Sequence, residues 1–164
     1  MEKMLAAVFH KNETNGGKIQ LEEVNVLQIT KSDQVLIEVK ACGICGTDLK
    51  IIEGGHPAND NMILGHEFAG VVKEIGKNIH DLKIGDKVVV DPNEKCGYCI
   101  NCRRGLSNLC EYMALGTTFG IFQNGGFAKF CVLPRNALFK LPEKIDLVAA
   151  SLIEPLSCAV HCHN

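Results

Sequence analysis

Nine cysteines stand in the 164 residues of this chain, and four of them form a compact pattern. Two residues separate Cys96 from Cys99 and Cys99 from Cys102, and seven residues separate Cys102 from Cys110. A two-residue spacing lets a tight turn direct successive sulfurs toward one point, and four thiolates fill the tetrahedral shell of a structural zinc ion. Such a site has no open position. We therefore expect it to stabilise a lobe at about residues 92–114 rather than to catalyse.

Three other interpretations of the four cysteines agree less well with their spacing. Bacterial ferredoxins also use C-x2-C-x2-C, but their fourth cysteine follows after three residues and precedes a proline. Here seven residues intervene and Glu111 follows. Zinc ribbons of nucleic-acid proteins use two separated C-x2-C pairs and a basic surface, which a net charge of −2 does not provide. The least favoured alternative is that the four cysteines are buried structural thiols that have this spacing by chance.

A second set of residues with metal-ligand chemistry is spread over three segments. The segments are Cys42-Gly-Ile-Cys45-Gly-Thr-Asp48, Gly65-His-Glu67 and Glu154 before a proline. Each segment alone has another explanation. The two cysteines could be a redox pair, and His66 and Glu67 would usually point to opposite faces of a strand. Glu154 could be a solvated residue at the start of a helix. Together they supply a thiolate, an imidazole and two carboxylates. That mixed shell can leave a position for water or substrate, as in catalytic zinc sites.

With these motifs in order, the sequence resembles the amino-terminal catalytic domain of the zinc-dependent medium-chain alcohol dehydrogenases. The branch is that of the polyol (sorbitol- and arabinitol-type) and threonine dehydrogenases. The matching stretches cover essentially the whole chain: CGICGTD from Cys42, GHEFAGVV from Gly65, GDKVVVDPN from Gly85, the four-cysteine segment from Cys96, GGFAKFCVLP from Gly125 and IEPLSCAVH from Ile153. The resemblance implies a mainly β fold with short helices, a GroES-like and partly open β-barrel that carries the four-cysteine zinc lobe.

The resemblance also implies which residues hold a catalytic zinc ion. Cys45 matches the thiolate ligand, His66 matches the second ligand, and Cys42 matches a position that does not ligate. Glu67 and Glu154 match carboxylates that hold zinc directly or through its water. Because His66 and Glu67 are adjacent, they can converge on one ion only if the strand breaks at this point.

Three further residues match supporting roles in the chemistry. Asp48 matches a carboxylate that orients the metal-binding imidazole. Thr47 matches the hydroxyl that carries away the alcohol proton, before hydride transfer to the nicotinamide of NAD or NADP. Lys50 stands where many relatives have a histidine that passes the proton to solvent. We therefore predict a changed proton path or pH optimum.

The elements that must position these residues are mostly short strands between glycine turns. Apolar and alternating runs predict strands at 5–10, 18–26, 35–39, 68–75 with a break at Gly70, 88–90, 127–133 and 137–141. Many short strands with glycine turns favour a small barrel or sandwich. Near the end of the sequence, Asp146 predicts the start of a helix with its body at 147–153, and Pro155 fits the first turn of another helix.

The sequence contains no G-x-G-x-x-G after a strand, the motif that binds the pyrophosphate of a dinucleotide. We expect residues 1–164 to be the GroES-like zinc-binding catalytic domain of an enzyme of roughly twice this length. The Rossmann domain would be absent, and the chain would be cut in an interdomain helix at about 155–164. Such a chain would bind up to two zinc ions. It would be inactive alone, because hydride transfer needs the cofactor held against the substrate.

Composition excludes some partners. Residues are 46% hydrophobic and 22% charged, which is typical of a globular protein, and the net charge of −2 gives no support for nucleic-acid or anionic-membrane binding. The apolar run at 4–9 is too short for a signal peptide, and no run approaches a membrane span of about 20 residues. We expect a cytoplasmic protein with reduced thiols. The full-length enzyme would be a homo-oligomer acting on a small alcohol or polyol.

The remaining candidates have ordinary explanations. His56 is predicted to be a solvated loop histidine, and Cys131 and Cys158 are predicted to be packing residues because they fall on apolar patterns. Cys162 lies with two histidines at the end of the sequence, where a core helix is expected. Two other function classes stay open. One is a stand-alone zinc-binding module without enzymatic activity, and the other is a redox-switch protein whose four cysteines release zinc reversibly on oxidation.

Overall fold

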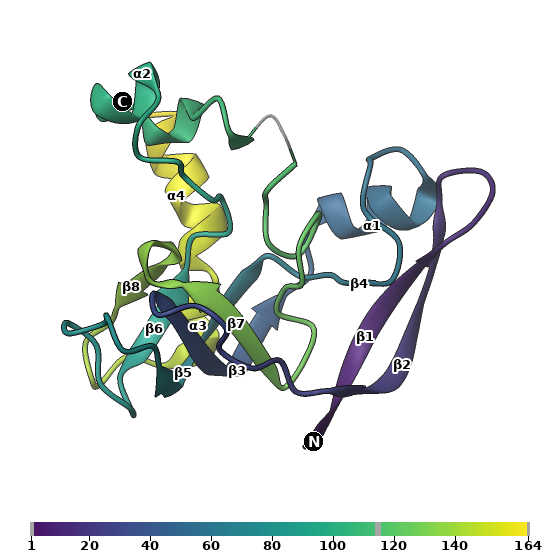
Figure 1. Cartoon of the computed structure of the whole chain (residues 1–164). Coiled ribbons are helices and arrows are strands. Elements are labelled where there is room, and N and C mark those ends of the chain that lie inside the picture. The colour runs from purple at the N-terminus through teal and green to yellow at the C-terminus, as the bar shows by residue number, and fades with distance from the viewer. Residues whose placement is uncertain (1, 114–115, 164) are drawn as a thin grey trace.

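A computed structural model describes residues 2–113 and 116–163 and arranges them around two antiparallel sheets (Figure 1). The smaller sheet has the order β2-β1-β4 and consists of β1 (Lys3–Lys11), β2 (Gly17–Asn25) and β4 (Met62–Ile63). The larger sheet has the order β7-β3-β5-β6-β8. Its strands are β3 (Gln34–Gly43), β5 (Glu67–Ile75), β6 (Lys87–Val90), β7 (Phe130–Pro134) and β8 (Leu138–Lys140).

Short helices connect and cover the strands. They are α1 (Gly46–Glu53), α2 (Ile100–Arg103), α3 (Leu147–Ser151) and α4 (Ile153–His161), with 3-10 turns η1 (Ser107–Leu109) and η3 (Arg135–Ala137). Within the described ranges, no helix is both long enough and apolar enough to span a membrane. The outer limits at 114 and 164, expected for the zinc lobe and the last helix, lie outside the described residues.

The larger sheet is open, because β7 and β8 are its two edges and do not pair with each other. The prediction of a mainly β fold with short helices and a partly open barrel is therefore confirmed. In β3, Val35 and Ile37 are fully buried while Leu36 and Glu38 are half-buried, which is the period-two pattern of a strand with one face on the core. The main core lies on this face and also contains Phe68, Val72, Val88, Leu133 and Leu138.

Gly70 does not interrupt β5, contrary to the sequence prediction. The strand continues from Glu67 to Ile75, and β3 shifts register opposite it, between Val39 and Ala41. A Cβ atom at Gly70 would lie 2.3 Å from the carbonyl oxygen of Glu38. Glycine is needed here because the neighbouring backbone comes very close at an irregularity in the pairing.

A second buried cluster holds α1 against the rest of the domain. Ile51 of α1 packs with Phe9 of β1, and with Leu64 and Ile121 from two loops. The helix ends at Glu53, and the φ of 83° at the following residue, Gly54, is the left-handed conformation that favours glycine at a helix C-terminus. This packing places the first turn of α1, with Cys45 as its N-cap, beside the start of β5.

The helical region near the end of the chain begins as predicted. The Asp146 carboxylate accepts hydrogen bonds from the backbone N–H groups of Val148 and Ala149 and caps α3. The second helix, α4, begins at Ile153 and includes Glu154 and Pro155 in its first turn. Figure 1 shows α4 running away from the sheets alongside the segment that carries α2.

Candidate metal centres

The four cysteines of the C-x2-C-x2-C-x7-C pattern come together in a lobe that projects from the sheets beside α4 (Figure 1). Cys99 is the N-cap of α2, and its sulfur accepts a hydrogen bond from the backbone N–H of Cys102 at 3.4 Å. The sulfur of Cys96 likewise accepts from the N–H of Cys99 at 3.3 Å, and the sulfur of Cys110 accepts from the N–H of Cys96 at 3.4 Å. These backbone donors stabilise negative charge on sulfur.

The spacing of the sulfurs fits a single zinc ion. Four sulfurs bonded to one tetrahedral zinc at about 2.3 Å must lie about 3.8 Å from one another. The Sγ atoms of Cys96 and Cys102 are 3.9 Å apart, and those of Cys96 and Cys110 are 3.6 Å apart. The lobe therefore has both the donor set and the separations of a structural zinc site.

The thiols of the lobe differ in acidity. The backbone N–H of Cys96 lowers the pKa of the Cys110 thiol to about 6. Hydrogen bonds from the backbone of Cys102 and Glu111 lower the pKa of Cys99, whereas burial raises the pKa of Cys102 to about 12. Zinc binds cysteine as the thiolate, so a metal ion bound here would release the protons that remain on these sulfurs.

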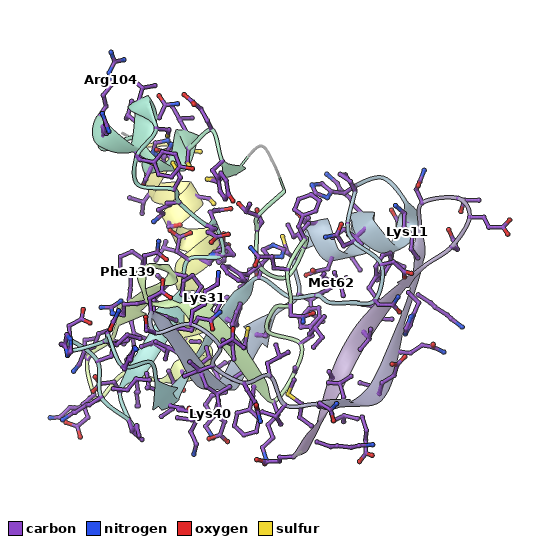
Figure 2. The ribbon with its side chains drawn as sticks, in the orientation of Figure 1. Lys11, Lys31, Lys40, Met62, Arg104 and Phe139 are labelled. Atoms are coloured by element: carbon purple, nitrogen blue, oxygen red, sulfur yellow. The ribbon has the colours of Figure 1, made fainter. Side chains whose placement is uncertain are left out.

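The lobe has little hydrophobic core of its own. Its large apolar side chains are exposed: Tyr98, Ile100, Leu106, Leu109 and Tyr112. Figure 2 shows Arg104 extending outward from the end of the lobe. Because so little apolar surface is buried, hydrophobic packing alone contributes little to the order of this segment.

A second group of ligand atoms lies at the junction of α1 and β5. One ligand atom from each of Cys45, His66 and Glu67 lies within 4.8 Å of the others. His66 and Glu67 are 6% and 8% exposed, and Cys45 is half-buried. The structure thus brings together three of the four predicted ligands of the catalytic zinc. A thiolate, an imidazole and a carboxylate suit zinc in both softness and geometry.

The strand is interrupted before Glu67, as it must be if His66 and Glu67 are to converge on one point. Strand β5 starts at Glu67, and Gly65 has a φ of 88°, so His66 precedes the regular alternation of the strand. A Cβ atom at Gly65 would lie 2.5 Å from the Phe127 ring and 2.8 Å from the sulfur of Cys42. No role for Gly65 was predicted from the sequence, although a glycine directly before the ligand pair is the signal of such a turn.

Backbone groups from a distant segment support this turn. The carbonyl oxygen of Gly65 accepts a hydrogen bond from the N–H of Gly126 at 2.7 Å. A Cβ atom at either Gly120 or Gly125 would lie 2.2 Å from the same oxygen. The glycines of the 120–126 segment therefore let backbone pack directly on the turn that presents His66.

Asp48 lies behind the imidazole, as the resemblance implied. It is 1% exposed, and its Oδ2 accepts a hydrogen bond from the backbone N–H of Cys45 at 2.8 Å. Its Oδ1 is 3.6 Å from Nδ1 of His66, which is too far for a hydrogen bond, and within the described chain neither of these buried atoms has a hydrogen-bond partner. Burial raises the pKa of the Asp48 carboxyl, although the Cys45 N–H and His66 oppose the shift.

The two cysteines of the C-x2-C motif have different surroundings. Cys45 is in the ligand group, whereas Cys42 is not, and the sulfur of Cys42 lies 3.5 Å from the carbonyl oxygen of Gly43. Burial, together with the nearby Asp48 charge, raises the pKa of Cys42 to about 12. Cys42 is therefore a neutral thiol at neutral pH. Its position agrees with the prediction that it does not ligate.

The other predicted site residues lie outside this group of three. Glu154 lies in the first turn of α4 and outside the three-residue ligand group. Burial raises its pKa, while the charge of His66 lowers it and that of Glu67 raises it further. Glu154 also lines a cavity of about 500 Å³ between α4, β6 and the lobe.

Thr47 Oγ1 is 3.6 Å from Cys45 Sγ, and Lys50 is exposed on α1.

Four residues with ordinary explanations lie outside both ligand groups. Nδ1 of His56 lies 2.8 Å from the carbonyl oxygen of Pro57, within its own loop. Cys131 is fully buried in the main core, so its prediction as a packing residue is confirmed. The same prediction for Cys158 is wrong in this chain, because Cys158 is exposed on α4, as is Cys162. The apolar side chains of α4 do not face the core along the whole length of the helix.

Comparison with known proteins agrees with this fold and donor set. Residues 31–143 match the model of the alcohol dehydrogenase GroES-like domain. D-xylulose reductase A of Aspergillus oryzae is 40% identical over 148 residues, which are 88% of this chain and 41% of that protein. Because the family match covers more than half of the chain, the chain belongs to the alcohol dehydrogenase GroES-like domain family.

Solved structures extend the likeness to the whole described fold. One is a zinc-binding dehydrogenase from Sinorhizobium meliloti 1021 bound to NADP, with a TM-score of 0.86 and 35% identity over 98% of this chain and 45% of its own. Another is galactitol-1-phosphate dehydrogenase from Escherichia coli, with a TM-score of 0.84 and 28% identity over 95% of this chain and 43% of its own. The chain thus spans less than half the length of the relatives that it matches.

Proposed function

We propose that this chain is the zinc-binding catalytic part of an NAD- or NADP-dependent dehydrogenase that oxidises a secondary alcohol or polyol. The observation that carries the proposal is the convergence of Cys45, His66 and Glu67 in front of a buried Asp48. The similar D-xylulose reductase supports the substrate class, because reduction of a keto sugar gives a polyol with a new secondary hydroxyl. The bound cofactor of the similar dehydrogenase supports the hydride carrier.

The two ligand groups would hold two zinc ions with different tasks. Cys96, Cys99, Cys102 and Cys110 would hold a structural ion. Cys45, His66 and Glu67 would hold the other, with Glu154 completing the shell directly or through a water molecule. When bound there, zinc acts as a Lewis acid that polarises a substrate oxygen and lowers the pKa of its hydroxyl group.

The chain's own residues would orient the ligands and move a proton. Asp48 faces Nδ1 of His66 and leaves Nε2 as the ring nitrogen available to the ion. The hydroxyl group of Thr47, beside the Cys45 sulfur, would accept the proton of the substrate hydroxyl. Lys50 lies three residues further along α1, on the same helix face as Thr47. In its neutral amine form, its side chain would accept the proton that leaves the Thr47 hydroxyl and would then give it to water.

The cofactor would be bound by a part of the protein outside residues 1–164. These residues contain no G-x-G-x-x-G motif, and the chain spans 41% of the similar reductase. Hydride transfer requires the nicotinamide ring to be held against the substrate. We therefore expect negligible turnover from this chain alone. We expect NAD(P)-dependent turnover from the complete protein, which we propose to be a homo-oligomer in the cytoplasm.

The test is expression of the complete reading frame, followed by metal analysis and a screen of polyols, secondary alcohols and D-xylulose with both cofactors. We expect two zinc ions per chain and activity that Cys45→Ala abolishes, while the exposed Cys158→Ser leaves it intact. Iron with visible colour would contradict the zinc assignment. Two zinc ions without dehydrogenase activity would favour a stand-alone zinc-binding module. Zinc released reversibly by peroxide, in a protein without dehydrogenase activity, would favour a redox switch.

The proton path has its own test. Lys50→Ala in the complete enzyme should change the pH–rate profile for kcat, because the path from Thr47 to water loses its last group. Metal content should stay at the wild-type value, since Lys50 is exposed and is not in either ligand group. An unchanged pH–rate profile would remove Lys50 from the proposed path.

A further inference from the structure

Gly43, the last residue of β3, lies directly opposite Glu67, the first residue of β5. A Cβ atom added to Gly43 would lie 2.3 Å from Oε2 of Glu67 and 3.3 Å from the Cβ atom of Glu67. Nonbonded atoms do not approach to 2.3 Å. The carboxylate of Glu67 therefore occupies the space that any side chain at position 43 would need.

The backbone at Gly43 gives no separate reason for glycine. Gly65 and six other described glycines have positive φ angles, but Gly43 does not, so its backbone conformation is open to ordinary residues. Three residues away, Gly46 also lacks a positive φ, and an added Cβ atom there would meet no atom within 4 Å. Gly43 and Gly46 thus differ in the space around them, and at Gly43 that space is filled by one carboxylate.

We infer that Gly43 is a positioning residue for the second metal centre. Its missing side chain lets the Glu67 carboxylate lie against the end of β3, where one of its oxygens is within 4.8 Å of the ligand atoms of Cys45 and His66. This inference rests on the zinc site proposed above. An alanine at position 43 would displace the carboxylate more readily than the strand, because the atom in its way is the free end of a flexible side chain.

The experiment compares Gly43→Ala with Gly46→Ala, a matched change in the same segment. The four-cysteine site of each chain is first filled with one equivalent of zinc, and Co²⁺ is then titrated while absorption from the cobalt–thiolate bond is recorded. We expect Gly43→Ala to weaken Co²⁺ binding by about 10- to 100-fold, as for other residues that orient metal ligands. Gly46→Ala should stay within about twofold of wild type, because its added methyl group meets nothing.

A second background separates positioning from general damage to the sheet. In Glu67→Ala, which already lacks the carboxylate, adding Gly43→Ala should cause no further loss of Co²⁺ affinity. An equal loss in both backgrounds, or an unchanged affinity in Gly43→Ala alone, would overturn the inference. Failure of the wild-type chain to bind Co²⁺ at this centre would instead contradict the proposed function.

A readout without metal keeps the inference testable in that case. In crystal structures of the metal-free chains, Gly43→Ala should move the Glu67 carboxylate away from β3 while the β3–β5 pairing stays in place. A carboxylate that keeps its wild-type position while the strands separate would show that Gly43 serves the sheet and not the ligand.

Discussion

The two candidate metal centres of this domain are built in opposite ways. The four-cysteine lobe takes its ligands from residues 96–110, one short stretch of chain, and backbone N–H groups of the same stretch support the sulfurs. The second centre takes its ligands from the start of α1 and the start of β5. The Cys45 and His66 ligands are 21 positions apart in the sequence.

The surroundings of the two centres differ as much as their ligands. The lobe exposes its apolar side chains and has no substantial core, whereas the second centre stands on the buried Asp48 and on tightly packed glycines. A local site needs its ion to become ordered, but a site built between packed elements is ordered before the ion arrives. The lobe should therefore depend on metal for structure, and the second centre should depend on structure for metal.

The largest expected effect is in the lobe. Cys110→Ser removes one of four thiolates, and structural zinc sites contribute about 10–16 kcal/mol of apparent binding free energy that depends on the full ligand set. We expect the loss of about one zinc ion per chain and rapid proteolysis within 96–113, while the two sheets stay folded. Zinc analysis and limited proteolysis measure this. Cys158→Ser, at an exposed thiol, should change neither. A zinc-replete, protease-resistant Cys110→Ser chain would show that packing orders the lobe.

Two glycines, one before His66 and one in the four-cysteine lobe, test how tightly the backbone is packed at the two centres. Gly65 and Gly97 have similar positive φ angles of 88° and 76°, so alanine should strain either backbone by about 1–2 kcal/mol. Only at Gly65 does the new methyl group also meet close atoms, which should add about 1–3 kcal/mol. Urea unfolding should therefore show a larger loss of stability for Gly65→Ala than for Gly97→Ala. Equal losses would mean that the turn before His66 is no more tightly packed than the lobe.

A smaller effect is expected from the support behind the imidazole. Asp48→Asn keeps an oxygen that can accept from the Cys45 N–H but removes the charge that faces His66. Metal affinity at the second centre should fall by about tenfold, and zinc in the lobe should be unaffected. Co²⁺ titration measures the change, with the exposed Asp60→Asn as control. A loss of zinc from the lobe as well would contradict the independence of the two centres.

The smallest effect concerns the sheet itself, away from both centres. Burial would raise the pKa of Asp86, but hydrogen bonds from Lys140 Nζ at 2.8 Å and from the Lys83 N–H at 3.0 Å outweigh it, and the net pKa is lowered. This contribution to stability is complete above the unfolded-state pKa of about 3.9 and is lost as pH falls through the lower folded-state value. Asp86→Asn should therefore be less stable than wild type at neutral pH.

The pH dependence is measured by urea unfolding of chelator-treated chains between neutral pH and pH 3. The difference between wild type and Asp86→Asn should stay constant down to about pH 4 and shrink below it. A difference that grows on acidification would mean that the ionised Asp86 carboxylate is not the stabilising form.

Much of the strand order along the chain could be predicted from sequence, because apolar alternation reports directly on one buried face, as at Val35 and Ile37. Gly70 was predicted to break its strand. Its actual role depends on how near the Glu38 backbone comes, which no local pattern records. Cys158 was predicted to be buried because its helix reads as apolar, but which helix face is covered depends on its neighbours in space.

The convergence of the four cysteines could be predicted from their spacing, since residues two and seven positions apart meet through local turns alone. The family resemblance also indicated which of Cys42 and Cys45 faces the second centre. How that centre is held depends on the tertiary structure. The turn at Gly65, the buried Asp48 and the carboxylate of Glu67 lying in the space left by Gly43 all depend on strands and a helix meeting across long sequence separations. Spacing can specify ligands that share a turn, but ligands on different elements are positioned by packing.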